Sequence, residues 1–440
     1  MMASRFGQQG WRSGSLAAVA ITALLTTFVL AVVLPNLWYG LHDVSDIPLY
    51  QSYASRMAKG EIPFTGSFLV EYPPLAMPLF RLPGHVGDAA DYAAWFGAWM
   101  SLLTILASVL TVLVARLLWA DEWRTWAVVL LFPLGVALTG AIILNRYDAA
   151  VAWVLAGVLL CLVRRWYTAA ALIVGIGFAL KFTPAALLPL VLLLTGPPRL
   201  WWRPILAFTL AAVVPFIVYL PPDLSGIWHV FRYHMERPLQ IESVLATPML
   251  LGQLLGADWA HSGHSHGSQS LIAPGTDIAA AASGLLTLLA AAGVYSLIWR
   301  RRARLATTAG DAVLAVFALL LALMSFSKVL SPQYFIWLLP AWALVAVRDR
   351  TLAILGCLVL LLTHVEFPAL YWRLVAMDPL ALAIVIARNL LLLALFATTA
   401  WRLWRLPDSA SDAGRRDRTG TARRHVTPGP AAGPSIPSPP

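Results

Sequence analysis

The sequence contains little charge, and this scarcity limits the classes of protein that it can encode. Aspartate, glutamate, lysine and arginine together make up 12% of the 440 residues, whereas about a quarter of the residues of a soluble globular protein are charged. A soluble globular fold is therefore excluded.

Cysteine is almost absent as well. Only Cys161 and Cys357 occur, and each falls within an apolar run. Two isolated cysteines provide neither a disulfide framework nor a thiolate metal site. We interpret both as small buried hydrophobic side chains. An internal repeat, of the kind that many transporters contain, is also missing from the sequence.

Apolar residues dominate what is present, at 60% of the chain. Apolar runs of about 20 residues recur from end to end, which is long enough to cross a bilayer as helices. These runs do not alternate apolar with polar residues as the strands of a membrane barrel do. The sequence therefore predicts an all-α polytopic membrane protein, a bundle of about 12 transmembrane helices with a large first loop outside the membrane.

The first apolar run, residues 15–35, is followed by no small-residue cleavage site, so we interpret it as a retained signal anchor. In the loop after it, residues 48–59 are predicted to form a short amphipathic helix. Residues 170–196 are ambiguous, because Pro184 and Pro189 interrupt the apolar pattern. This stretch forms either two full membrane spans or a pair of broken helices.

Positive charge is unevenly distributed over the connections between the predicted spans. Arginines gather on one side of the membrane, as at residues 300–302, and most carboxylates occur in loops on the other side. By the positive-inside rule the arginine-rich side is cytoplasmic, so the net charge of +10 reports topology and not nucleic-acid binding. We predict a plasma-membrane protein with both termini in the cytoplasm. Its parts are a cytoplasmic N-terminus (1–14), a membrane domain (15–405) with outer loops over about 36–92 and 221–276, and a disordered cytoplasmic tail (406–440).

Polar side chains that suit catalysis are concentrated in the outer loops and at the outer ends of spans, where charges indicate function. The first outer loop carries Asp43, Asp46, Tyr50, Glu71 and Tyr72. The later candidates are Arg146, Asp148, Lys181, His234, Arg237, Gln240, Glu242, Lys328 and Gln333. Bases beside a carboxylate-rich loop suit an anionic lipid-linked substrate, because the bases can hold phosphate and a carboxylate can accept a proton from an attacking hydroxyl.

Six of these candidates also have a structural explanation. Asp46 can cap the helix that follows it, and Glu71 can be a solvated loop acid. Arg146 and Asp148 can form a local ion pair across a tight turn. The two lysines can extend their side chains to the membrane surface.

Two further groups are left open by the sequence. His261, His264 and His266 are spaced as metal ligands can be, but their serine and glycine neighbours are more typical of a flexible loop. Arg388 lies deep within the last span and pairs either with a helix carbonyl or with Glu366.

Seven short motifs together resemble the family 87 (DUF2029-type) members of the GT-C membrane glycosyltransferases, which use polyprenyl-phosphate-mannose. The motifs are Asp46-Ile-Pro-Leu-Tyr50, Gly60-Glu-Ile-Pro-Phe64, Glu71-Tyr-Pro-Pro-Leu75, Asn145-x-x-Asp148, Lys181-Phe-Thr-Pro184, Arg237-Pro-Leu-Gln-Ile-Glu-Ser243 and Ser331-Pro-Gln-Tyr334. The resemblance implies a GT-C-like fold, chemistry at the outer face with inversion at the anomeric carbon, and Asp46 as the catalytic base. Many GT-C enzymes have an adjacent acidic pair in this loop, whereas here two residues separate Asp43 from Asp46, which leaves the choice between them open.

We therefore expect an integral membrane glycosyltransferase that moves a sugar, with mannose as the expected one, from a polyprenyl phosphate. Its expected partners are this donor, a cell-envelope glycolipid or polysaccharide acceptor and membrane lipids, with no nucleic acid. The sequence assigns no cofactor and leaves a divalent metal open. The alternative is a transporter or flippase of lipid-linked sugars, which would favour a site at the membrane midplane and repeat symmetry.

Overall fold

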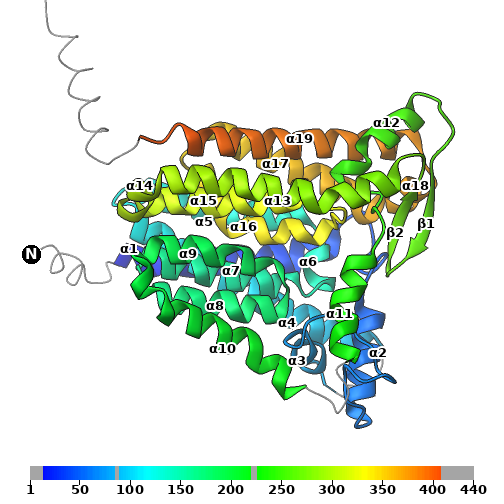
Figure 1. The fold of residues 1–440 in the computed structure, drawn as a ribbon, viewed down its shortest axis with the longest axis horizontal. Helices are drawn as coiled ribbons and strands as arrows, with labels where there is room; N and C mark the ends of the chain where they lie inside the picture. The colour runs from blue at the N-terminus through cyan, green and yellow to red at the C-terminus, as the bar shows by residue number, and fades with distance from the viewer. Residues whose placement is uncertain (1–12, 85–88, 220–224, 408–440) are drawn as a thin grey trace, which may run out of the picture.

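The computed structural model describes residues 13–84, 89–219 and 225–407, and it is a bundle of helices aligned along its longest axis (Figure 1). Short helices and a β-hairpin lie at one end, which we call the loop end. The loop end is marked by α2 (Ile47–Ala58), α3 (Ala76–Arg81), α11 (Ser225–Glu236), α12 (Thr247–Leu254), α18 (Tyr371–Val375) and the strands β1 (His261–Ser265) and β2 (Ser268–Ile272). We call the opposite end, where α1 begins and α19 ends, the arginine end.

Apolar helices of different lengths form the bundle between these ends. They are α1 (Ser13–Phe28), α4 (Ala89–Leu118), α5 (Glu122–Thr139), α7 (Asp148–Val163), α8 (Tyr167–Leu180), α9 (Leu188–Thr195), α10 (Trp202–Val218), α13 (Thr276–Arg300), α15 (Ala309–Ser325), α16 (Leu339–Ala346), α17 (Arg350–His364) and α19 (Pro379–Trp404). The short helices α6 (Ile142–Asn145) and α14 (Arg302–Thr307) lie between bundle helices.

The described residues contain five helical stretches that are long and apolar enough to cross a membrane. These are Gly14–Asn36, Ala89–Leu118, Thr276–Arg300, Arg350–Ala369 and Pro379–Trp404. Apolar helices of 10–17 residues accompany them. The expected all-α multi-pass membrane fold is confirmed, whereas the number of about 12 crossings stays a prediction.

Residues 170–196 form a broken pair of helices. After α8, the 3₁₀ helix η3 (Thr183–Leu187) leads into the short α9. Pro184 and Pro189 each lie in the first turn of their own helix, where the missing N–H costs no hydrogen bond. Of the two alternatives for this stretch, the structure has the second.

Aspartate side chains cap the starts of α17 and α19. Asp349 accepts hydrogen bonds from the backbone N–H groups of the first turn of α17, and Asp378 does the same for α19. Gly140 ends α5 with a φ of 77°, and a Cβ atom at this position would lie 2.6 Å from the Tyr39 hydroxyl. Only glycine combines this left-handed backbone with so close a contact.

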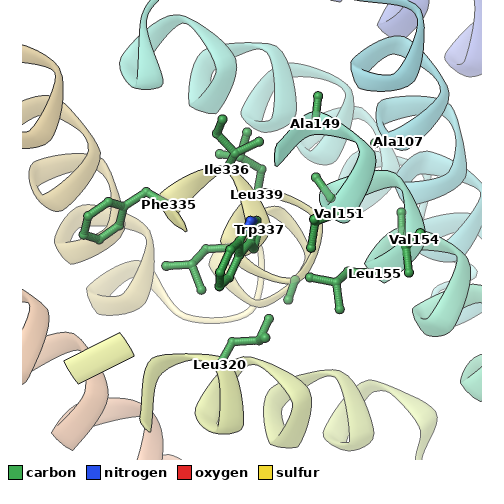
Figure 2. Close-up of a cluster of buried hydrophobic side chains, with 14 of the residues drawn as sticks. Ala107, Ala149, Val151, Val154, Leu155, Leu320, Phe335, Ile336, Trp337 and Leu339 are labelled. Atoms are coloured by element: carbon green, nitrogen blue, oxygen red, sulfur yellow. The ribbon is translucent and has the colours of Figure 1, made fainter. Parts of the chain in front are cut away.

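Side chains from distant parts of the sequence form the core. Trp337, only 2% exposed, lies at the centre of one buried cluster, with Leu320 on one side and Val151 and Leu155 of α7 on another (Figure 2). Trp337 belongs to the 3₁₀ helix η6 (Pro332–Leu338), which leads into α16. The core thereby fixes the position of η6, which extends toward the loop end.

Ion pairs fasten the arginine end. Asp311 is fully buried and accepts hydrogen bonds from Arg304 Nε at 2.8 Å and Arg348 Nη2 at 2.9 Å. Arg402 Nε lies 2.5 Å from Asp349 Oδ2. These carboxylates balance part of the positive charge at this end of the bundle.

Residues 1–12 and 408–440 lie outside the described part of the chain, and they include most of the predicted N-terminal segment and tail. Residues 220–224, at the start of the second predicted loop, also lie outside it.

Candidate active site at the loop end

Asp46 lies directly before α2, at the loop end of the bundle. Its side chain makes no capping hydrogen bond to the helix, so the alternative of a helix cap is wrong. Instead, Asp46 Oδ2 lies 3.1 Å from Arg146 Nε and accepts a hydrogen bond from the Tyr50 hydroxyl at 3.3 Å. The Asp46 side chain is 26% exposed, whereas that of Arg146 is 6% exposed. A buried partner thus orients a carboxylate that a substrate can still reach.

Asp43, the other candidate base, has a different environment. It is exposed, and its Oδ2 accepts a hydrogen bond from the backbone N–H of Gly40 at 2.8 Å. This contact closes a local turn, as aspartate side chains commonly do. The two acids therefore differ in their partners, whereas in the sequence the family resemblance favours Asp46 and leaves the choice between them open.

Tyr50 and Tyr72 lie in a cluster of aromatic rings beneath Asp46. The Tyr50 ring, 1% exposed, stacks on Phe80 of α3 with ring centroids 4.2 Å apart. Tyr72 meets the edge of Tyr147 at 5.3 Å, and Tyr147 also contacts Tyr50. Edge-to-face and stacked pairs of this kind add stability beyond the buried area. The cluster fixes α2, and with it Asp46, against the end of α7.

Asp148 and Lys181 form an ion pair between α7 and the end of α8. Lys181 Nζ lies 2.6 Å from Asp148 Oδ1, which also accepts a hydrogen bond from Trp337 Nε1 at 2.7 Å. The rings of Tyr147, Tyr334 and Trp337 surround the ammonium group, with centroids 4.7–4.9 Å from Nζ. Such contacts stabilise a cation. The charge of Lys181 is thus balanced inside the protein, at a fully buried carboxylate.

The local ion pair that the sequence suggests between Arg146 and Asp148 is not formed, because each side chain pairs elsewhere. Arg146 has an extended backbone after α6, whereas Asp148 is the first residue of α7 and lies in the core. Arg146 pairs with Asp46 and Asp148 with Lys181.

Glu71 connects the first loop to the second. Burial raises the pKa of Glu71 and the negative charge of Asp46 adds to this increase, while hydrogen bonds from Tyr72 and Tyr233 and the positive charge of Arg237 oppose it. A solvated loop acid would have none of these interactions. Both Asp46 and Arg237 are therefore close enough to act on one carboxyl group, which places the two loops around a common site.

His234 lies on α11 and contacts the backbone of Glu71. Its Nε2 lies 3.1 Å from the Glu71 carbonyl oxygen, which can only accept a hydrogen bond, so Nε2 carries the proton. Burial, together with the positive charge of Arg237, lowers the pKa of His234 to about 4. The imidazole is therefore neutral at neutral pH.

Arg237 and Lys328 are two neighbouring basic groups on the second-loop side of the site. Arg237 Nη2 donates a hydrogen bond to Ser268 Oγ at 2.8 Å, and its buried Nε has no partner among the described residues. Lys328 Nζ donates one hydrogen bond, at 2.5 Å, to the carbonyl oxygen of Met235, so two of its three N–H donors have no partner within the described part of the chain. Burial, and then the charge of Arg237, lower the pKa of Lys328, which indicates that the two cations are close to one another.

Glu242 lies in a buried polar cluster with Glu366 and Arg388. All three side chains are at most 1% exposed. Gln240 Nε2 donates to Glu242 Oε2, and Arg388 Nη2 donates to the Glu242 carbonyl oxygen at 2.9 Å. Burial and the neighbouring Glu366 carboxyl raise the pKa of Glu242 well above its usual range. Of the two alternatives for Arg388, a carbonyl is the hydrogen-bond partner, although it belongs to the loop and not to a helix.

The remaining candidate, Gln333, lies at the start of η6, where its Oε1 accepts a hydrogen bond from the Ser331 hydroxyl. Roles in substrate binding for Gln240, Glu242 and Gln333 stay predictions. Within residues 13–84, 89–219 and 225–407, no group of three or more histidine, cysteine, aspartate or glutamate side chains is arranged to hold a metal ion.

Residues 261–272 form a β-hairpin, so the expectation of a flexible loop is wrong. Backbone pairing to a more distant segment explains the order. The N–H of Ile241 donates to Gln269 O at 3.1 Å, and the N–H of Leu271 donates to Leu239 O at 2.9 Å. Residues 239–241 thus pair with β2 through a β-bridge between Gln240 and Ser270, outside the two-stranded sheet. An isolated two-stranded hairpin is marginally stable at best, so this added pairing explains why the hairpin is ordered.

Three side chains that the sequence did not nominate belong to this site. Tyr233 interacts with Glu71, Ser268 holds Arg237, and Trp337 holds Asp148. The only sequence signal for them was closeness in sequence to residues already singled out. Tyr233 comes just before His234 and Arg237, and Ser268 comes just after the three histidines. Their partners are 30 or more positions away, which no local pattern encodes.

Comparisons with known proteins give the class of this protein. The sequence model of glycosyltransferase family 87 matches residues 68–325. Together with the multi-pass helical bundle, this match makes the protein a membrane glycosyltransferase. Because the matched residues are more than half of the chain, the protein belongs to glycosyltransferase family 87.

The solved structures that match this chain share little sequence identity with it. Crystal structures of ArnT from Cupriavidus metallidurans, bound to undecaprenyl phosphate and in the apo state, share 14% sequence identity, with TM-scores of 0.45 and 0.47. Each comparison covers 94% of this chain and 81% of ArnT. The Archaeoglobus fulgidus oligosaccharyltransferase, tethered with an acceptor peptide, shares 13% identity over 90% of this chain and 55% of its own, with a TM-score of 0.39. A search of proteins with curated annotation found no match.

Proposed function

We propose that this glycosyltransferase moves a hexose from a polyprenyl-phosphate donor to a glycolipid or polysaccharide acceptor, with inversion at the anomeric carbon and with Asp46 as the base. The observation that carries this proposal is the environment of Asp46. Its carboxylate is partly exposed, and it is oriented by Arg146 and Tyr50 and not used as a helix cap. A general base must be both oriented and reachable by the proton that it accepts.

The proposed reaction is a single displacement. The acceptor hydroxyl oxygen attacks the anomeric carbon and its proton passes to Asp46, while the bond from that carbon to the phosphate oxygen breaks on the opposite face. The lipid phosphate leaves with the bonding electron pair. Carboxylates close to the ring stabilise a transition state with oxocarbenium character, and Asp46 and Glu71 are candidates for this role.

Arg237 and Lys328 are the proposed ligands of the leaving phosphate. Both have N–H donors without a partner among the residues that the structure describes, and hydrogen bonds from charged donors to phosphate are strong. Lys181 is a weaker candidate than the sequence suggests, because Asp148 and three aromatic rings already stabilise its charge. Its proposed role is to hold the ends of α7 and α8 together beneath the site.

In this proposal the loop end faces the extracytoplasmic side of the plasma membrane, and both termini are cytoplasmic. The arginine pairs at the opposite end of the bundle support this orientation through the positive-inside rule. Mannose as the sugar, and the cell envelope as the destination, rest on the family resemblance of the motifs. The flippase alternative loses its support, because the chain belongs to a glycosyltransferase family.

Transfer of radiolabel tests the proposal. Membranes containing the protein are supplied with polyprenyl-phosphate-[¹⁴C]mannose and a membrane glycolipid extract, and labelled products are separated from the donor. We expect a new labelled product from the wild type and a decrease of about a thousandfold for Asp46→Asn, since a positioned base contributes about 10²–10⁴ in rate.

Asp43→Asn is the matched control, because it removes the neighbouring carboxyl group from a turn and not from the site. It should retain most of the activity. Normal transfer by Asp46→Asn at unchanged protein levels would remove Asp46 from its role. Label that crosses the bilayer without any new product would support the flippase.

A further inference from the structure

The tip of the β-hairpin, at His266 and Gly267, has no role in the proposed reaction. The hairpin is rigidly attached at its base. Gln240 and Ser270 form a β-bridge, and Ser262 Oγ donates to the Val375 carbonyl oxygen of α18 at 2.9 Å. Across the hairpin, Ser270 Oγ donates to Gly263 O at 2.7 Å. The position of the tip is therefore determined by the body of the protein.

The turn at the tip has an unusual occupant. Ser265 pairs with Ser268, so that the two residues between them, His266 and Gly267, form the turn. Both have left-handed backbones, with φ of 47° and 64°, as a two-residue type I′ turn requires. Asn-Gly is the favoured pair for this turn, and histidine has a larger ring to accommodate. A residue that departs from the favoured turn chemistry is a candidate for a functional role.

The tip contacts the proposed active site at three points. The His266 ring lies against Tyr233, with ring centroids 5.1 Å apart. A Cβ atom at Gly267 would lie 3.3 Å from the Tyr233 hydroxyl and 3.8 Å from Glu71 Oε1, so the backbone of the tip lies directly over these two groups. Ser268 accepts the hydrogen bond from Arg237. The tip therefore covers the side of the site that contains Glu71 and Arg237.

The chemistry at this point suits a sugar ring. His266 is half-buried, and its Nδ1 and the neighbouring Ser265 hydroxyl are buried without a hydrogen-bond partner among the described residues. Unpaired buried polar atoms are costly, which favours a bound group that supplies the missing hydrogen bonds. The phenol ring of Tyr233 adds an apolar face with a polar edge, and the Glu71 carboxyl group adds an acceptor. Pyranoses present apolar C–H faces and hydroxyl groups to such a set.

We propose that His266 is a sugar-binding residue and that the hairpin tip, with Tyr233 and Glu71, forms a pyranose subsite next to the reaction centre. The subsite rests on the proposed function, since it binds a sugar that takes part in that transfer. Hydroxyl groups of the transferred sugar or of the acceptor sugar both fit this chemistry. His266 orients the ring through hydrogen bonds, and the rigid hairpin keeps the imidazole in place.

Steady-state kinetics on the full-length protein test this proposal. His266→Asn is the main variant, because asparagine suits the left-handed turn while its shorter side chain cannot reach the sugar in the same way. We expect the variant to be at least as thermostable as the wild type, and to have a KM about tenfold higher for one of the two sugar substrates, with a smaller change in kcat. An increase in the KM of the polyprenyl-phosphate sugar alone assigns the subsite to the donor, and an increase for the acceptor alone assigns it to the acceptor.

His264→Asn is the matched control, because His264 lies on the same hairpin but is exposed. Its KM values should equal those of the wild type. If His266→Asn and His266→Ala both fold and both keep each KM within twofold of the wild type, the subsite is refuted while the transferase remains. If the wild type transfers no sugar while the protein is folded, both the proposed function and the subsite are refuted.

Discussion

Two regions of the loop end are built in different ways. We call residues 37–84 the first region and residues 225–272 the second region. Charged and aromatic side chains attach the first region to the bundle, as in the pairs Asp46–Arg146 and Tyr50–Tyr147. Hydrogen bonds to backbone groups attach the second region: the N–H of Gln240 donates to Lys328 O at 2.9 Å, and α19 donates from Arg388 and Asn389 to the carbonyl oxygens of residues 242 and 243. The region that contains the proposed base therefore depends on charge, and the region that surrounds the proposed phosphate site depends on main-chain geometry.

The apolar contacts of the first and second regions also differ. The first region packs into the main core of the bundle through side chains such as Phe64, Phe68 and Phe80. The second region has a smaller core of its own, in which Leu239, Ile241 and Leu271 pack against α18 and α19. A separate core makes the second region a stable unit against which the first is placed. Substitutions that remove a charge should therefore lower stability most in the first region. Substitutions that add bulk should lower stability most at the junction between the two regions.

The largest effect is expected from the ion pair beneath the first region. Asp148→Asn should lower the free energy of unfolding by about 3–5 kcal/mol, because Lys181 would remain nearly buried without its anion. Thermal unfolding of the detergent-purified protein measures this change. Adding Lys181→Met to Asp148→Asn should recover part of the loss, since the unpaired charge is then removed. A single variant that unfolds within about 1 °C of the wild type would contradict the assignment.

The junction between the two regions should give the second largest effect. A Cβ atom at Gly226 of α11 would lie 1.7 Å from the carbonyl oxygen of Phe64, and a backbone atom cannot move aside as a flexible side chain can. We expect Gly226→Ala to cost roughly 3 kcal/mol, at the upper end for overpacking, and to lower transfer because α11 carries His234.

Gly284→Ala is the control for this variant, because Gly284 lies within α13 and nothing lies within 4 Å of the added Cβ. It should be neutral or slightly stabilising, by up to about 1 kcal/mol, as alanine favours helix. Equal unfolding temperatures for the two alanine variants would show that the contact between the regions is not tight.

The third effect is a dependence on pH that belongs to the second region. The pKa of His234 is lowered from 6.5 to about 4 in the folded protein, so the unfolded chain binds more protons between these values. Its contribution to stability is fully present above pH 6.5 and is lost as the pH falls toward 4. We expect a loss on the order of 2 kcal/mol, after allowance for partial exposure. Unfolding of the wild type and His234→Gln from pH 4 to 7 measures the difference, and parallel curves would contradict it.

The first region was the more predictable of the two, because its signals are local. The amphipathic pattern of residues 48–59 predicted α2, whose observed bounds are Ile47–Ala58, and the acids before it predicted a reactive carboxylate. What could not be predicted was the partner of that carboxylate. Arg146 is 100 positions away from Asp46, and nothing in the turn around Arg146 indicates that it pairs with Asp46 and not with Asp148 two residues later.

The second region was hardly predictable for a related reason. Residues 261–272 contain serine, glycine and histidine, which are typical of loops. Their order comes from pairing with residues 239–241 and from packing on α18 and α19, both of which depend on the completed fold. The polar residues at positions 237–243 stay predicted site residues, and the burial of Glu242 beside Glu366 could not be inferred, because segments distant in the sequence enclose it.

The smallest effects are expected from the surface ion pair of each region, and these sharpen the comparison. Arg232 and Glu236 are both more than half exposed, so Arg232→Ala should change stability by less than about 0.5 kcal/mol. Arg56 pairs with Glu61 but also donates to the Ser67 carbonyl oxygen at 2.5 Å and stacks over Phe68 at 4.0 Å.

Arg56→Ala should therefore cost about 1–2 kcal/mol, since a hydrogen bond and a cation–π contact are lost together. Arg56→Lys should recover little of this loss, because an ammonium group cannot make all three contacts at once. Thermal unfolding at low and at 0.5 M salt separates the contributions, since salt screens the exposed pair of the second region and leaves the stacking contact of the first. If salt changes the unfolding temperatures of Arg232→Ala and Arg56→Ala equally, the contacts of Arg56 with Ser67 and Phe68 do not stabilise the surface of the first region.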